Sequence, residues 1–296
     1  MATVRALGAL GLATAAIALC AAQTQLAFWN CNESNPLDET AMLAADSGVF
    51  AAQAQISIAF AEFRFNNSST GFRGSPADPN NPTHPTTPNW ALQTTNYPAQ
   101  GENSGQAGIV VSVPTTGYEN ITIKFDVRWS NTASKYLAVE YTTDGGSTWT
   151  RVRQLEAKRG DRWHSEADPN GYGELVQIDL SNNAAVNNNS GFAFRVVTIF
   201  DPNLGNAYSP ARQPDREYSS QGTLRYDLIE VLGTEIGSGV EGDVNGDGCV
   251  DDADLLQVLF NFGATGDNDA DVNNDNIVDD ADLLIVLFNF GTGCGG

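Results

Sequence analysis

Apolar and polar residues alternate in many short segments between residues 24 and 232, a pattern typical of half-buried β-strands. The segment ISIAFAEFRF (Ile56–Phe65) shows it most plainly. Gly, Asn and Pro separate the segments, and only Glu39–Ala45 suggests a short helix. The pattern predicts a mainly β fold, an antiparallel β-sandwich or jelly roll. Its expected strands are Leu26–Asn30, Ile56–Phe65, Gly108–Val113, Ile121–Trp129, Tyr136–Tyr141, Thr148–Gln154, Glu174–Leu180, Phe192–Phe200 and Thr223–Leu232.

A stretch rich in proline and asparagine, Gly74–Pro98, interrupts this series. Proline has no backbone N–H to donate to a neighbouring strand, so we expect a surface loop and not a central strand. Long loops on a rigid scaffold often carry binding function. The alternative is a plain surface excursion that Trp90 and Tyr97 hold down.

The first 22 residues resemble a signal peptide. Arg5 precedes an apolar run, Ala6–Ala22, which is too short to span a membrane comfortably. Small residues at Cys20 and Ala22 predict cleavage before Gln23, and hence a secreted or cell-surface protein. Lipidation of Cys20 is the alternative, which the bulky Leu19 disfavours. No later segment is long and apolar enough to cross a membrane.

Negative charge is concentrated at the C-terminal end. The chain has a net charge of −21, and the residues from Glu241 to Gly296 contain thirteen acids but no Lys, Arg or His. Nucleic acid is therefore not an expected partner. This shift in composition divides the chain into a β-sandwich domain (23–233), a flexible linker, TEIGSGVE (234–241), and a second domain (242–296).

The second domain contains an internal duplication. Asp243–Gly263 (DVNGDGCVDDADLLQVLFNFG) and Asp271–Gly291 (DVNNDNIVDDADLLIVLFNFG) are identical at seventeen of twenty-one positions. Each copy opens with oxygen-bearing side chains at positions 1, 3, 5, 9 and 12, the spacing of a calcium-binding loop. Such a loop turns its alternate residues inward on one hard cation.

The spacing predicts two Ca²⁺ sites, with a backbone carbonyl as the ligand at position 7. Because eight carboxylates would otherwise face one another, we expect folding to depend on the ions. The first set of ligands is Asp243, Asn245, Asp247, Cys249, Asp251 and Asp254, and the second is Asp271, Asn273, Asp275, Ile277, Asp279 and Asp282.

Each loop precedes one predicted helix, Ala253–Phe262 or Ala281–Phe290, and no helix precedes either loop. This loop-then-helix pair resembles a type I dockerin. The resemblance implies docking onto a cohesin-like or other cell-surface protein through residues 242–296, often in assemblies that degrade polysaccharide. The basic pair usual in dockerin helices is missing. Leu259-Phe260 and Leu287-Phe288 would either pack the helices together or form an apolar docking surface.

Three cysteines follow the predicted cleavage site. Cys249 and Cys294 bracket the duplication and are the preferred disulfide pair. Cys31 lies in a strand-like stretch, where we expect a small buried apolar residue, although an odd count leaves a free thiol open.

The β domain contains one recognisable hairpin motif. Thr142–Trp149 (TTDGGSTW) matches the Asp-box, in which Asp144 would bind turn amides and Trp149 would pack under the hairpin. The wider domain resembles sandwich modules of exported bacterial proteins, which are seldom catalytic.

Candidate chemistry in this domain is sparse. Trp90 and Trp163 lie in predicted loops and form a possible platform for sugar rings, whereas Trp29, Trp129 and Trp149 are expected in the core. His84 and His164 are expected at the surface. Four acids could supply a pair for glycoside hydrolysis, but their spacing selects no two of them; these are Glu140, Glu156, Glu166 and Asp168.

These features favour an exported calcium-binding protein. Its β-sandwich would serve as a binding or display domain, and the dockerin-like domain would tether it to a partner or to the cell surface. The alternative is a polysaccharide-degrading glycoside hydrolase or a carbohydrate-binding component of such a system, and a purely adhesive protein is a third possibility.

Overall fold

A computed structural model describes residues 23–32, 38–64, 72–79, 89–167, 169, 171–236, 241–266 and 268–294. The segment Gln23–Ile236 forms one compact unit, and the chain from Gly237 onward belongs to a second. The predicted signal peptide, including Cys20, lies outside the described residues. So do residues 237–240 of the predicted linker.

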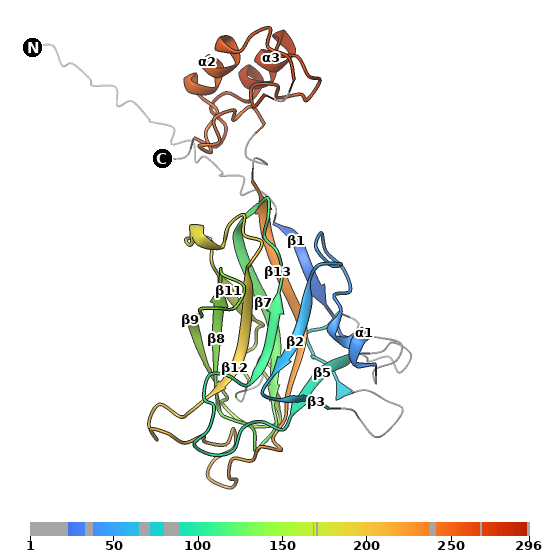
Figure 1. Ribbon diagram of the computed structural model, residues 1–296, viewed down its shortest axis with the longest axis vertical. Helices are drawn as coiled ribbons and strands as arrows, with labels where there is room; N and C mark the ends of the chain where they lie inside the picture. The colour runs from blue at the N-terminus through green and yellow to red at the C-terminus, as the bar shows by residue number, and fades with distance from the viewer. Residues whose placement is uncertain are drawn as a thin grey trace, which may run out of the picture. The chain divides into compact units, whose positions relative to one another are not determined.

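The first unit is built from two antiparallel sheets (Figure 1). One sheet has five strands in the order β2-β6-β12-β8-β9. These strands are β2 (Gln55–Ala59), β6 (Gly108–Ser112), β12 (Ala193–Ile199), β8 (Tyr136–Thr142) and β9 (Thr150–Glu156).

The other sheet has eight strands and is organised around two long ones, β7 (Tyr118–Trp129) and β13 (Leu224–Glu235). Its main path runs β10-β7-β13-β5-β3, while β11 also pairs with β7, β1 with β13, and β4 with β5. The shorter strands are β1 (Thr24–Trp29), β3 (Glu62–Phe63), β4 (Phe72–Arg73), β5 (Trp90–Thr95), β10 (Arg162–Trp163) and β11 (Val176–Asp179).

Apolar side chains from both sheets meet in one core. Trp29 and Phe125 enter it from the eight-stranded sheet, and Ile109 and Phe194 from the five-stranded sheet. The rings of Phe125 and Phe194 stack across the interface with centroids 6.3 Å apart. Two short helical turns flank the strands, α1 (Glu39–Leu43) and η1 (Ala184–Val186). The unit is therefore mainly β with two facing sheets, as the alternating pattern predicts.

Three local expectations differ from the structure. The predicted strand Ile56–Phe65 divides at Phe60, where φ is 47°, so that β2 and β3 join different sheets. Trp90–Thr95 is an inner strand although it lies in the proline-rich stretch; the prolines all fall before or after it. Thr234 and Glu235, predicted as linker, pair with Glu119 and Tyr118 and extend β13.

The described residues of the second unit form two helices, α2 (Asp252–Phe260) and α3 (Asp280–Asn289). Each begins with a capping box, formed by Asp251 with Asp254 and by Asp279 with Asp282. Its buried core consists of four valines and one alanine; these are Val250, Val258, Ala270, Val278 and Val286. A core this small gives little stability to a unit of this length without further restraints.

Candidate functional site

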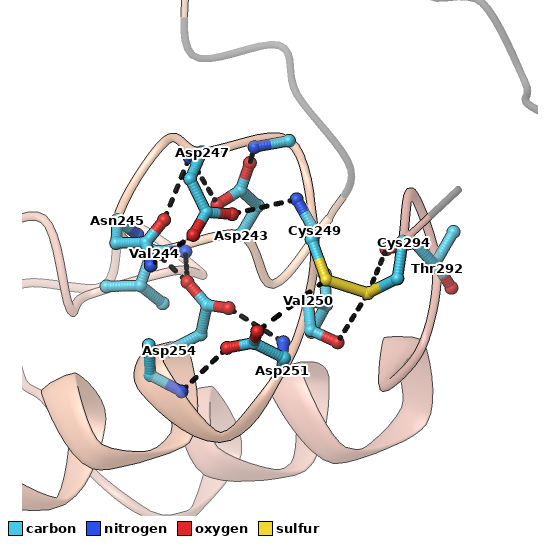
Figure 2. Close-up of a disulfide and its surroundings, with 12 residues drawn as sticks. Asp243, Val244, Asn245, Asp247, Cys249, Val250, Asp251, Asp254, Thr292 and Cys294 are labelled. Atoms are coloured by element: carbon cyan, nitrogen blue, oxygen red, sulfur yellow. Dashed lines mark hydrogen bonds between the residues drawn. A yellow bond between two sulfur atoms is a disulfide. The ribbon is translucent and has the colours of Figure 1, made fainter. Parts of the chain in front are cut away.

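The first acidic loop coils so that its side-chain oxygens turn toward its own backbone (Figure 2). Asp243 accepts hydrogen bonds from the amides of Gly246 (2.9 Å) and Gly248 (2.8 Å). Asn245 accepts from Asp247 N (2.8 Å), and Asp247 accepts from Cys249 N (3.0 Å). The loop therefore gathers its predicted ligands at positions 1, 3 and 5 within a single turn.

Asp254, at position 12, closes the same loop from the helix side. Its carboxylate is fully buried and accepts from Val244 N (2.8 Å), Asn245 N (2.9 Å) and Asp251 N (2.8 Å). Capping of α2 accounts for aspartate at positions 9 and 12 without a metal. It does not account for Asp243, Asn245 and Asp247, which precede the helix and cap nothing.

The second loop repeats this arrangement. Asp271 accepts from Asp275 N (3.0 Å) and Asn276 N (2.7 Å), Asp282 is fully buried, and it accepts from Asn273 N (3.0 Å). Asn276 takes φ 73°, the left-handed conformation that Gly248 takes in the first loop. Asparagine thus preserves the turn where the repeat lacks glycine.

The two repeats are joined by reciprocal backbone pairing. Val250 donates to Thr292 O (2.9 Å) and accepts from Gly291 N (2.7 Å), beyond α3. Val278 donates to Ala264 O (3.0 Å) and accepts from Gly263 N (2.8 Å), beyond α2. Each loop is therefore held by the segment that follows the other repeat's helix. A disulfide between Cys249 and Cys294 fastens the first of these contacts (Figure 2).

The donor chemistry of both loops fits a hard cation. Carboxylate, amide and peptide oxygens are the ligands that Ca²⁺ prefers, and the loops contain no basic side chain. In residues 241–266 and 268–294, however, the side chains make hydrogen bonds to loop amides, and no three His, Cys, Asp or Glu groups converge as a metal cluster.

Large apolar side chains cover the outer faces of both helices. Leu255 and Leu283 pack partly against the small core, but Phe260 and Phe288 are 83% and 84% exposed. The other members of this apolar face are Leu256, Leu259, Phe262, Leu284, Leu287 and Phe290. These exposed apolar residues, called the apolar face below, come in equal number from the two repeats.

In the sandwich, the two tryptophans predicted as a ligand platform lie apart in the sheet. Trp90 begins β5 and is half-buried. Trp163, in β10, is only 5% exposed, which leaves little ring surface for a ligand. Strands β7 and β13 lie between β10 and β5, so the two rings belong to separate parts of the sheet.

Trp149, expected in the core, is instead half-buried on the outer face of the five-stranded sheet. The Arg195 guanidinium lies 4.3 Å from its ring centre, and Glu140 anchors Arg195 (2.6 Å) and Arg151 (3.1 Å). In the hairpin before it, Asp144 accepts from Thr148 N (2.9 Å), and hydrogen bonds from Thr142 and Thr148 lower the pKa of Asp144. A hollow of about 390 Å³ beside the ring is lined mostly by small residues, including Ser57, Ser112, Gly146 and Ser190.

Three of the four candidate catalytic acids are engaged in ion pairs with basic side chains. Glu140 is ion-paired with two arginines, Glu156 with Lys135, and Glu166 with Arg162; Asp168 lies outside the described residues. His164 is buried, contrary to expectation: its Nδ1 lies 2.6 Å from Glu174 O, and burial lowers its pKa. His84 also lies outside the described residues.

None of the helices in the described part of the chain has the length and apolar character needed to cross a bilayer.

No protein-family profile matches the chain, and no curated protein matches it. Solved structures that resemble it in part include a tandem of family 22 carbohydrate-binding modules from Paenibacillus barcinonensis, with 13% identity and a TM-score of 0.30. That match covers 49% of this chain and 40% of the tandem.

A family 61 carbohydrate-binding module solved with β-1,4-galactotriose has 12% identity and a TM-score of 0.29, over 68% of this chain and 97% of that one. The K1 cleaved adhesin domain of Lys-gingipain from Porphyromonas gingivalis has 12% identity and a TM-score of 0.27, over 60% of this chain and 96% of that one. At these scores the likeness shows neither a family nor a ligand for this chain.

Proposed function

We propose that the second unit is a two-site calcium module that tethers an exported β-sandwich to a protein partner. In each repeat, the side chains at loop positions 1, 3, 5, 9 and 12 and the carbonyl at position 7 hold one ion. The observation that carries this proposal is the duplicated loop, which repeats acidic residues at calcium-ligand spacing before buried Asp254 and Asp282, with no basic residue between Glu241 and Gly296.

Bound Ca²⁺ would supply the positive charge that both loops lack and would link each loop to its helix. The chain's own residues do the rest. The capping boxes fix where α2 and α3 begin, and the five small core residues hold the helices together. Folding and calcium binding are therefore coupled, and the apolar face of the helices is organised only in the bound form.

Hydrogen exchange measured by mass spectrometry on the full chain tests this coupling. Chelating calcium should remove protection from peptides covering 243–263 and 271–291. Asp254→Asn keeps a hydrogen-bond acceptor but removes a ligand charge, so we expect it to weaken calcium binding at the first loop about 10- to 100-fold. Asp252→Asn removes the same charge from an exposed position that holds no ion, and should change affinity little. Equal effects of the two substitutions, or unchanged protection after chelation, would refute the proposal.

The proposed partner is a cohesin-like protein that binds the exposed apolar face. Surface plasmon resonance against a panel of purified cohesin modules, with calcium and with chelator, tests this. Phe260→Ser combined with Phe288→Ser removes the two most exposed rings without touching a loop ligand. We expect calcium-dependent binding that this double variant loses. Binding that survives both the chelator and the double variant would exclude this face.

A second function, binding of polysaccharide by the sandwich, is favoured by Trp149. Its partly exposed ring beside a hollow of small and hydroxyl-bearing residues suits the stacking of a sugar ring. Affinity electrophoresis in gels containing soluble polysaccharides should show retardation that Trp149→Ala abolishes and Trp90→Ala preserves. Released reducing sugar, measured on the same samples, would show that the sandwich is a glycoside hydrolase instead. No retardation in any gel would leave the sandwich as a display or adhesive domain.

A further inference from the structure

Two aspartates face each other in the middle of the eight-stranded sheet, on the side away from the core. Asp126 of β7 is paired with Asp227 of β13, and both are fully buried. Each lies where its strand changes partner. Strand β13 pairs with β5 up to Tyr226 and with β1 from Ile229. Strand β7 pairs with β11 up to Phe125 and with β10 from Arg128.

The two carboxylates are satisfied to different degrees. Asp126 accepts four hydrogen bonds, from the hydroxyls of Ser75 and Ser165 and from the amides of Ser165 and Val127. From the described residues Asp227 accepts two, from Ser75 N (2.6 Å) and Leu228 N (2.8 Å). Among the ion pairs of the described residues none includes Asp227.

A buried amide oxygen without a hydrogen-bond donor lies beside Asp227. Asn89 is 3% exposed. Its Nδ2 donates to Ser75 O (2.9 Å), but its Oδ1 receives no hydrogen bond within the described part of the chain. An unsatisfied buried acceptor is costly and rare in folded proteins. Something that the described protein atoms do not provide is therefore expected next to Asn89 Oδ1.

Gly74 shows how closely oxygen atoms crowd this place. A Cβ on Gly74 would lie 1.9 Å from Asn89 Oδ1, 2.5 Å from Asp227 Oδ2 and 2.6 Å from Trp90 O. The three oxygens, two from the neighbouring residues Asn89 and Trp90 and one from Asp227 of β13, therefore lie close to one another against the Gly74 backbone, which only glycine allows. Oxygen atoms gathered in this way repel one another unless a cation or a proton lies between them.

We infer that Asn89 Oδ1, Asp227 Oδ2 and the carbonyl oxygen of Trp90 are ligands of a structural Ca²⁺ in the sandwich. A carboxylate, a side-chain amide and a peptide carbonyl together form an oxygen-only donor set of the kind that calcium accepts in irregular geometry. The set contains no nitrogen or sulfur ligand of the kind that zinc favours. Because only one of the three ligands is an acid, this site is not a cluster of three acidic side chains. The ion would join the start of β5 to the middle of β13.

Terbium luminescence on the full chain isolates this site, since Tb³⁺ replaces Ca²⁺ and emits when a nearby tryptophan is excited. The second unit contains no Trp or Tyr from Glu241 to Gly296, whereas Trp90 is itself a proposed ligand residue. We expect tryptophan-sensitised emission that calcium competes away. Asp243→Ala with Asp271→Ala, which disables both acidic loops, should preserve it. Asn89→Leu should reduce it at least about tenfold.

Asn89→Leu could also lose emission by unfolding, so a second variant serves as the control. Asn89→Asp adds a second carboxylate and should tighten Tb³⁺ binding about tenfold. Far-UV circular dichroism checks the fold of each variant. Emission that is unchanged in Asn89→Leu, or that is lost in the double loop variant, overturns the inference. So does Tb³⁺ binding in Asn89→Asp no tighter than in the wild type, the result expected if a proton or a water fills the gap.

Calcium content separates this site from the two acidic loops. Equilibrium dialysis followed by elemental analysis should find three ions per full chain, one after the double loop substitution and two after Asp227→Asn. No ion left in the double loop variant would refute the sandwich site alone. One ion in both the wild type and the double loop variant would refute the acidic loops alone.

Discussion

The Cys249–Cys294 disulfide provides the sharpest test of how the second unit holds together. The bond joins residues 45 apart in sequence and fixes the segment after α3 beside Val250, whose amide donates to Thr292 O. Closing a loop of that length lowers the entropy of the unfolded chain enough to add about 4 kcal/mol of stability. The core of four valines and an alanine offers little to replace this contribution.

Replacing both cysteines by serine should therefore destabilise the whole unit by about 4 kcal/mol, or roughly a thousandfold in its opening equilibrium. Hydrogen exchange at saturating calcium measures this directly on the full chain. The amides of Val250 and Gly291 report on the pair of segments that the disulfide joins. Val278 and Gly263 make the equivalent pair without a disulfide, because Ile277 occupies the place of Cys249.

If the unit unfolds cooperatively, both pairs should lose protection equally, while peptides from β7 in the sandwich stay unchanged. A loss confined to Val250 and Gly291 would mean that the disulfide only prevents local fraying. If protection of both pairs falls by less than about tenfold, the loop-closure entropy cannot be the main contribution of the disulfide, since its calculated effect is near three orders of magnitude.

Three further effects follow from buried groups. Val286→Ala should destabilise the second unit by about 2 kcal/mol, measured as faster exchange of 271–291, because it removes one of four core valines. Glu140→Ala should lower the sandwich's free energy of unfolding in urea by about 2–3 kcal/mol, and Glu140→Gln by less, because two arginines lose their acceptor. Burial holds the pKa of His164 below its usual 6.5, so the unfolded chain binds a proton that the folded chain does not. The contribution of His164 to stability should therefore be fully present above about pH 6.5 and be lost as the pH falls further; His164→Gln should flatten this slope below about pH 6.5.

The sequence predicted best the elements that are determined locally. Strand β7 alternates because one of its sides contributes to the core, and the helices of the second unit follow acidic caps that occur twice. Strand β5 could not be found in this way. Five of its six residues are buried, so both faces are covered and the alternation disappears, while prolines on either side suggest a loop.

The proposed site in the sandwich could not be predicted, because its residues come together only in the fold. Asp227 follows Tyr226 in ordinary alternation and would pass as a solvent-facing residue of a strand. It is buried because the segment containing Gly74 and Ser75 lies over it. For Trp149 the sequence errs in the opposite direction. An aromatic residue next to a strand suggests burial in the core, and nothing local indicates that Arg195 supports the ring on the outer face.

The exposed apolar face of the second unit is the feature least explained by packing. The repeats differ at four positions of twenty-one, namely Gly246/Asn274, Gly248/Asn276, Cys249/Ile277 and Gln257/Ile285. Three of these lie in the loops, and none is among the eight exposed Leu and Phe residues. Side chains such as Phe260 and Phe288 touch little of their own unit, so stability of the unit does not require them to be apolar. Exposed aromatic rings favour aggregation unless they are covered, and their presence in both copies is the reason for proposing a protein partner at these residues.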